Sequence, residues 1–250
     1  MIIIKNSEQL ALMKKAGRIT AEALLVAKDM IRPGISTKEI DKKMHDFIVR
    51  CDATPSFLGY GGFPGSACIS LNDEVIHGIP SERKILKEGD IVKIDVGARY
   101  RGYNGDSART FAVGKVSEQA LKLISVTEQS FYEAMKFARA GYRIGDIGFA
   151  VESFVISNGF SVVRDYVGHG VGKDLHEEPE IPNFGKAGRG ARLSSGMTLA
   201  IEPMVNVGVA GVKVQSDGWT VKTLDGKLSA HYENSIAVTD SDPILLTDAS

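Results

Sequence analysis

The sequence predicts a mixed α/β fold made of two similar halves that pack as one domain. Near the N-terminus apolar residues recur at helical spacing, and short strand-type runs follow them. The same order of segments returns about one hundred residues later. The sequence between the two copies contains no Pro/Ser-rich linker and no block of like charges. We therefore expect a single domain over residues 1–250, with halves at about 7–115 and 117–240 around a central antiparallel sheet.

The first half opens with two predicted helices. Apolar residues recur at helical spacing from about Ser7 to Ile31, and the run RPG at Arg32 ends that helix. Ser36 and Glu39 then match the capping-box pattern, which predicts the start of a second helix. Between Ala67 and Val113 the runs ACISL, DIVKIDVG and TFAV are broken by Gly, Asn and Pro, which predicts strands and loops.

The second half repeats this text closely enough to align. The run RPGISTKEIDKKMHDFIV from Arg32 resembles RAGYRIGDIGFAVESFVI from Arg139. The same shift places Asp95 on Glu202, both inside otherwise apolar strand text. An ionised carboxylate in such text is costly unless it is paired or bound to a metal, so two at equivalent positions favour a site at the junction of the halves. The same shift also aligns Leu86, Gly89 and Ile94 with Leu193, Gly196 and Ile201.

Further residues of the right chemistry lie near these two in the text. They are Asp106 in YNGDSART, His169 in GHGVG and Glu233 in HYENSIAV. Several carboxylates that converge in a core repel one another unless cations hold them, and an oxygen-rich set with one imidazole suits one or two divalent ions. Taken singly, Asp106 also fits an Asx-turn and Glu233 an exposed strand acid, and composition alone favours these non-functional interpretations.

Composition limits the classes of function. A formal net charge of −1 on 250 residues offers no basic face, so we expect no nucleic acid in the site. The run MIIIKNSEQL is too short for a signal peptide and no later run approaches a membrane span, so we expect no membrane partner and a cytoplasmic location. Two cysteines, Cys51 and Cys68, favour a reducing compartment, with one bridge between them as the alternative. Neither shows a nucleophile signature.

Five motifs in order, HGIP, KIDVGARYRGYNGD, GHGVGKDLHEEP, AIEPM and HYEN, resemble those of the bacterial type I methionine aminopeptidases. The resemblance covers nearly the whole chain. It implies a pseudo-twofold pita-bread fold, two divalent metal ions (Co, Mn, Fe or Zn) and removal of the N-terminal methionine from nascent proteins and peptides with a small second residue. A monomer is expected, and transient binding to the ribosome stays open.

The resemblance also implies a role for each site residue. Asp95 would bind one metal, Asp106 and Glu233 would bridge two, and His169 with Glu202 would complete the other. A metal pair of this kind activates a water and polarises the scissile carbonyl, and Glu202 would take the proton. His176 would contact the substrate and the reaction intermediate, and His77 would lie near the scissile amide. The methionine pocket would be formed by Tyr60, Phe63, Cys68 and Trp219.

Alternatives stand beside these roles. Without the resemblance, His77 and His176 would be read as histidines bonded to loop carbonyls, and Trp219 as a core residue. Compared with several relatives, Phe57, Phe63 and Ser107 are departures that bear on pocket shape and rate. The alternative functions are a proline-specific aminopeptidase or prolidase, and a binding module that keeps the fold without catalysis.

Four further polar residues lie outside the expected catalytic set. We expect structural or surface roles for Glu177 and Glu178 and a solvated His45. His231 lies two residues before Glu233 and so on the same strand face, which leaves a role behind the metal ligands open.

Overall fold

The computed structural model describes residues 1–249, and its first two helices begin where the sequence predicts. The Asn6 side chain accepts a hydrogen bond from the Gln9 amide, while the Gln9 side chain accepts from the Asn6 amide, each at 2.9 Å. Ser36 and Glu39 form the same reciprocal box. Both helix predictions are confirmed. The helices are α1 (Ser7–Met30), α2 (Thr37–Arg50), α3 (Glu118–Met135) and α4 (Ile144–Ser157), with a 3₁₀ turn at Tyr60–Gly62.

The strands form one large antiparallel sheet and two small ones. The main path runs β1-β4-β5-β14-β9-β7-β8, with β2 beside β4 and β15 beside β14. The small sheets are β13-β10-β6 and β11-β12-β3. The first-half strands are β1 (Thr54–Pro55), β2 (Ala67–Leu71), β3 (Glu74–Ile76), β4 (Ile91–Tyr100) and β5 (Tyr103–Ala112). The others are β6 (Ser161–Val162), β7 (Gly168–Gly170), β8 (Glu177–Ile181), β9 (Thr198–Ile201), β10 (Met204–Asn206), β11 (Val212–Val214), β12 (Val221–Thr223), β13 (Ser229–His231), β14 (Glu233–Ala237) and β15 (Ile244–Leu245).

The sequence repeat reappears as repeated local structure. An isolated bridge joins Ser36 to Ile85 in the first half, and its counterpart joins Arg143 to Arg192 in the second. The cap of α2 is a capping box, and the cap of α4 keeps one half of it, in which the Arg143 main-chain amide donates to Asp146 Oδ2 at 2.8 Å. The predicted duplication is therefore structural, and the fold class is confirmed as mixed helix and antiparallel sheet. Equivalent glycines, Gly34 with Gly141 and Gly89 with Gly196, all have φ between 87° and 96°.

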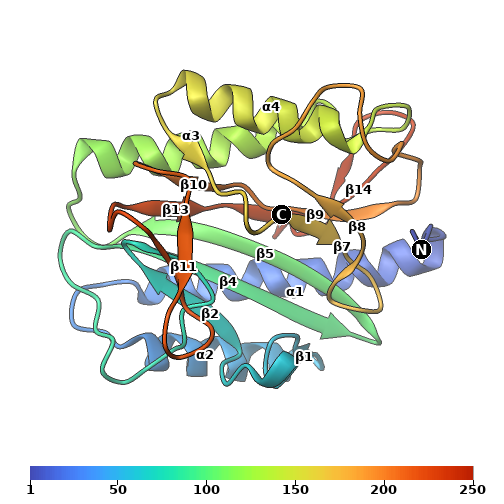
Figure 1. The fold of residues 1–250 in the computed structure, drawn as a ribbon. Coiled ribbons are helices and arrows are strands. Elements are labelled where there is room, and N and C mark those ends of the chain that lie inside the picture. The colour runs from blue at the N-terminus through green and yellow to red at the C-terminus, as the bar shows by residue number, and fades with distance from the viewer. Residues whose placement is uncertain (250) are drawn as a thin grey trace.

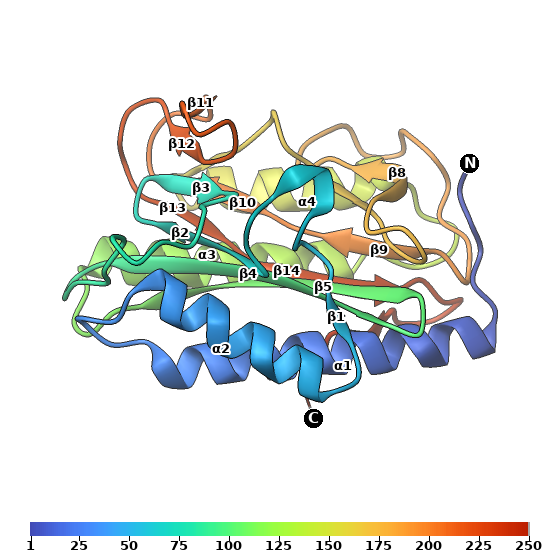
Figure 2. The ribbon, with the colours of Figure 1, turned by 90° about the horizontal axis from the view of Figure 1, so that it is seen from below.

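The two helices of each half of the chain lie together on one side of the molecule. Figure 1 shows α1 and α2 on one side of the molecule and α3 and α4 on the other, with the strands between them. Figure 2 shows α1 and α2 as a layer against β4 and β5, with the small β3-β11-β12 sheet on the opposite side. The two largest buried apolar clusters follow the same division, one under α1 and α2 and one under α3 and α4. No helix in residues 1–249 has both the length and the apolar character to cross a membrane.

Candidate metal centre and active site

Strand register places three acids on one face of the central sheet. Asp95 of β4 pairs with Ala108 of β5, and Glu233 of β14 pairs with Ala108 from the other side. Asp106 lies two residues before Ala108 and so faces the same side of β5. Gly105, directly before Asp106, faces α1, where a Cβ would lie 2.6 Å from Gly17 Cα. The acids therefore project from the face opposite that helix.

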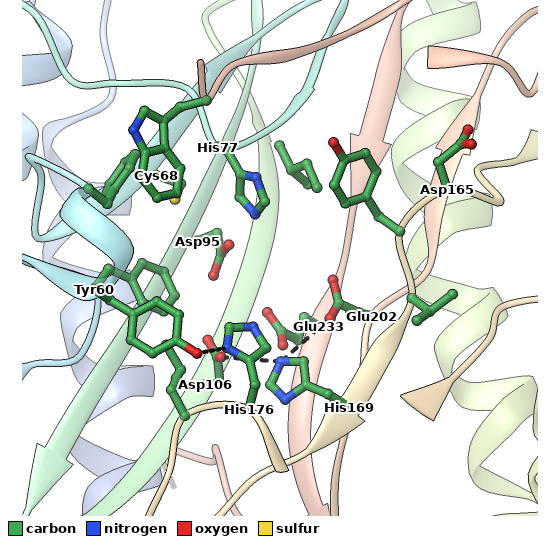
Figure 3. Close-up of a pocket in the computed structure, with 17 residues that line it drawn as sticks. Tyr60, Cys68, His77, Asp95, Asp106, Asp165, His169, His176, Glu202 and Glu233 are labelled. Carbon is green, nitrogen blue, oxygen red and sulfur yellow. Dashed lines mark hydrogen bonds and ion pairs between the residues drawn. The ribbon is translucent and has the colours of Figure 1, made fainter. Parts of the chain in front are cut away.

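The other two predicted ligands come from the neighbouring strands β9 and β7. Glu202 directly follows β9, whose Ile201 pairs with Asn234 of β14. His169 in β7 pairs with Ala200 of β9. Because each half contributes strands to this sheet, the site lies at their junction, as the sequence predicts. Figure 3 shows the five side chains converging on one cavity.

The tightest part of this group has the spacing of a metal site. One ligand atom each from Asp106, His169 and Glu233 lies within 4.8 Å of the other two. His169 Nε2 is 3.6 Å from Glu202 Oε1 and 3.8 Å from Asp106 Oδ2. Asp95 lines the same cavity beside this group.

Burial raises the pKa of every carboxyl group in the cluster. It raises the pKa of Asp106 to about 7, and burial together with the neighbouring acids raises the pKa of Asp95, Glu202 and Glu233 well above their usual values. Within residues 1–249, Asp95 Oδ1 and Asp106 Oδ1 are buried without a hydrogen-bond partner. A divalent cation would compensate buried, mutually repelling and unpaired carboxylate oxygens, so these residues fit the metal that the resemblance implies.

His169 is prepared to act as a neutral ligand. Its Nδ1 lies 2.8 Å from the Gly170 carbonyl oxygen, which can only accept, so Nδ1 carries the proton. The free Nε2 then faces Glu202 and Asp106. Burial lowers the His169 pKa to about 3, so the ring is uncharged at neutral pH. A hydrogen bond from the ring nitrogen that does not bind the metal fixes the orientation of a metal-binding imidazole.

Metal binding should therefore stabilise the chain more at high pH. The acids of the metal-free protein hold protons, and a bound cation must displace them. Because the pKa of Asp106 is about 7, fewer protons have to be displaced at pH 8 than at pH 6, and metal binding is correspondingly stronger at pH 8. His169 is neutral throughout that range and releases none. We expect the rise in melting temperature on adding Mn²⁺, measured by scanning calorimetry, to be larger at pH 8 than at pH 6. An equal rise at both values would contradict the assigned ligands.

Two histidines outside the ligand set line the same cavity. His176 stands at its solvent-exposed mouth with Nδ1 2.8 Å from the Tyr60 hydroxyl, and its ring centroid is 4.2 Å from that of His169. Tyr60 has a raised pKa because of burial and so keeps its proton, and when it donates to Nδ1 the His176 proton sits on Nε2. His77 approaches from another direction, with a backbone φ of 58° and a pKa lowered to about 4 by burial.

An apolar cluster closes one end of the cavity, whose volume is about 330 Å³. Phe63 and Trp219 meet edge to face with ring centroids 5.2 Å apart. Tyr60 lines the cavity at its rim, where the side chain is exposed and its hydroxyl is hydrogen-bonded to His176. Burial raises the pKa of the Cys68 thiol well above its usual value, so it stays protonated, and both cysteines are free. The cluster comprises Phe57, Phe63, Cys68 and Leu175, with Ile79 and Trp219 against it.

Sequence reasoning missed some of these residues. Leu175 and Ile79 lie in loops without periodicity, and the adjacent motif histidines were the one available signal. His45 was expected to be solvated, which is wrong: it is half-buried, and its Nδ1 lies 2.9 Å from Ser66 Oγ. The helix turns it toward the chain that enters β2.

His231 lies behind the ligands, against Glu202. Its ring is buried, with Nε2 3.6 Å from Glu202 Oε2. It ends β13, while Glu233 begins β14 after Tyr232, so the two are not neighbours on one continuous strand.

Fold and site together define a metallopeptidase. The chain matches the model of metallopeptidase family M24 over residues 11–240 and belongs to that family. It is 53% identical to methionine aminopeptidase from Clostridium acetobutylicum over 99% of both chains. It is 51% identical to methionine aminopeptidase 1 from Bacillus subtilis, again over 99% of both. The resemblance found in the motifs is confirmed.

Solved structures agree on the architecture. The crystal structure of methionine aminopeptidase from Thermotoga maritima aligns with a TM-score of 0.98 at 44% identity, covering 99% of this chain and 100% of that one. A prolidase from Pyrococcus furiosus aligns with a TM-score of 0.78 at 23% identity, and the match covers 99% of this chain but 66% of the prolidase. The second likeness shows the shared pita-bread fold alone.

Proposed function

We propose that this chain removes the N-terminal methionine from nascent proteins and peptides whose second residue is small. The observation that carries the proposal is one cavity that joins the five metal-ligand candidates to an apolar cluster. Aromatic rings around such a pocket suit a flexible thioether side chain. The relatives of this chain at 51–53% identity are methionine aminopeptidases, which supports specificity for an N-terminal methionine over the specificity of a prolidase.

Five residues would hold the metal ions. They are Asp95, Asp106, His169, Glu202 and Glu233, and the cofactor is proposed to be two divalent ions, with Co, Mn, Fe and Zn as candidates. When bound, such ions supply Lewis acidity that activates water and polarises a carbonyl. Four carboxylates and one imidazole suit all four of these metals, so availability in the cell would decide which is used.

The remaining polar residues would handle the proton and the substrate. Glu202 would take the proton from the attacking water, since its carboxylate lies beside the other ligands, with Oε1 3.6 Å from His169 Nε2. His176 would donate from Nε2 to the oxygen that becomes negative during attack, and His77 would contact the scissile amide. Tyr60 would orient His176 through the hydrogen bond to Nδ1.

We also propose that the enzyme acts as a monomer in the cytoplasm. The peptide N-terminus is its substrate, and the ribosome is a candidate transient partner. Residues 1–250 would act as one catalytic domain, with halves at about 7–115 and 117–240, because both halves contribute ligands to one cavity.

The specificity can be tested with three tripeptides. Metal-loaded protein should hydrolyse Met-Ala-Ser far faster than Met-Leu-Ser, because a bulky second residue would crowd the acid cluster. Leu-Ala-Ser should also be poor, although one such change in an apolar pocket is worth only about 10–200-fold. The measurement is kcat/KM for each peptide by release of the free amino acid. Equal values for Met-Ala-Ser and Met-Leu-Ser would contradict the proposed preference.

A further inference from the structure

The segment before α1 runs beside the loop that carries His176. The Lys5 amide donates to the Gly196 carbonyl at 2.8 Å. A Cβ at Gly196 would lie 2.7 Å from Ile4 Cγ2, and its φ of 87° also favours glycine. The main chain at Lys5 is therefore fixed against the body of the protein.

The Lys5 side chain ends in a buried ion pair with Glu177, the residue directly after His176. Lys5 Nζ lies 2.5 Å from Glu177 Oε2, and the two side chains are 3% and 4% exposed. Nζ also donates to the Ile3 carbonyl at 3.1 Å. By contrast, the Lys42–Asp46 pair on α2 is 72% and 43% exposed. Because an unpaired buried charge is strongly unfavourable, the Lys5–Glu177 pair is a firm restraint on the chain at His176.

The loop is shaped around this pair. A Cβ at Gly172 would lie 2.4 Å from Glu177 Oε1 and 2.7 Å from Lys5 Cε, so a larger residue there would displace the ion pair. On the other side, Asn104 Nδ2 donates to the carbonyls of Gly172 and Lys173, each at 3.0 Å. Residues 172–177 are thus held at both sides, and His176 lies at the end of the restrained segment.

Neither Lys5 nor Glu177 lines the cavity. We propose that they are positioning residues for His176, and that the ion pair between them fixes the loop so that the imidazole points at the acid cluster. The inference rests on the proposed function for the reaction that it affects. It gives the N-terminal segment a role in turnover, because this segment supplies a restraint that the loop lacks on its own.

The first test is the variant Lys5→Met. We expect kcat on Met-Ala-Ser to fall about 10-fold or more, as small misplacements of a catalytic group do, with KM within a few-fold. Binding of Mn²⁺ by calorimetry should be unchanged, and the ring resonances of His176 in NMR spectra at one pH should shift. Should Lys5→Met fail to fold, the double variant Lys5→Met/Glu177→Gln takes its place in these measurements, because it leaves no buried charge unpaired.

A double-mutant cycle separates positioning from a general loss of stability. In a His176→Ala background, Lys5→Met should change kcat less than about two-fold, because the group it positions is gone. The control Leu123→Ala, a core change in α3, should lower the melting temperature while kcat stays at the wild-type value well below that temperature. An equal loss of kcat in both backgrounds, or unshifted His176 resonances, would overturn the proposal. If the wild-type chain failed to cleave Met-Ala-Ser, the proposed function would fail, but the resonance shift would still report on the loop.

Discussion

Asp106→Asn should abolish nearly all activity and weaken metal binding while leaving the chain folded. The carboxylate faces His169 and Glu233 at ligand spacing, and a neutral amide cannot offset cationic charge. Loss of a residue behind a metal ligand typically costs about 10–100-fold, so loss of a ligand itself should cost more than about 10²-fold in kcat. The fold should survive because Ser235 Oγ is bonded to the main chain of Asp106, which the substitution keeps.

Metal titration by calorimetry and steady-state kinetics test this variant together. The matched control is Asp46→Asn, whose carboxylate is exposed on α2 and pairs only with Lys42 among the salt bridges that the structure shows for residues 1–249. The control should bind metal and turn over as the wild type does. Normal turnover with two ions bound to Asp106→Asn would remove Asp106 from the ligand set.

His176→Ala should lose turnover but keep its metal. We assign to His176 a hydrogen bond to the developing negative charge, and removal of one such donor costs about 10²–10³ in kcat, or about 3–4 kcal/mol. KM should stay within a few-fold because that charge is absent from the bound substrate. The exposed position of His176 means that its loss leaves no buried partner unsatisfied.

His169→Ala should fail differently, by losing metal affinity first. Its neighbours in VGHGVG are glycine and valine, which cannot replace an imidazole ligand. A useful control is His45→Ala, which lies on α2 against Ser66 and should keep both metal and turnover. Metal depletion in His176→Ala, or wild-type turnover by that variant, would show that the division between the two histidines is wrong.

The sequence predicts the elements of this fold better than the inner surface of its site. Capping residues such as Ser36 mark helix starts because the cap is a local interaction, and strand alternation places Asp95 on a defined face. The internal repeat adds long-range information, since it pairs Asp95 with Glu202 before any contact is known. The matching β-bridges at Ser36 and Arg143 show that the two halves share local structure, which is why the alignment of the repeat places Asp95 and Glu202 correctly.

What the sequence could not provide are contacts between segments without a shared pattern. Lys5 and Glu177 meet across 172 positions, and no spacing rule connects them. Leu175 enters the apolar pocket from a loop, where one leucine has no periodic neighbours to mark it as buried. The wrong expectation for His45 has the same cause: the polar face of α2 meets Ser66, which precedes β2.

The metal-dependent methionine aminopeptidase activity that we propose for this site can be tested directly. The direct measurement is hydrolysis of Met-Ala-Ser and of an Xaa-Pro peptide with a first residue other than methionine, after chelation and after return of defined metals. We predict no hydrolysis after chelation and recovery with metal, with Met-Ala-Ser cleaved far faster than the Xaa-Pro peptide. Faster cleavage of the Xaa-Pro peptide by the metal-loaded protein would contradict the account and assign the chain to the proline-specific enzymes.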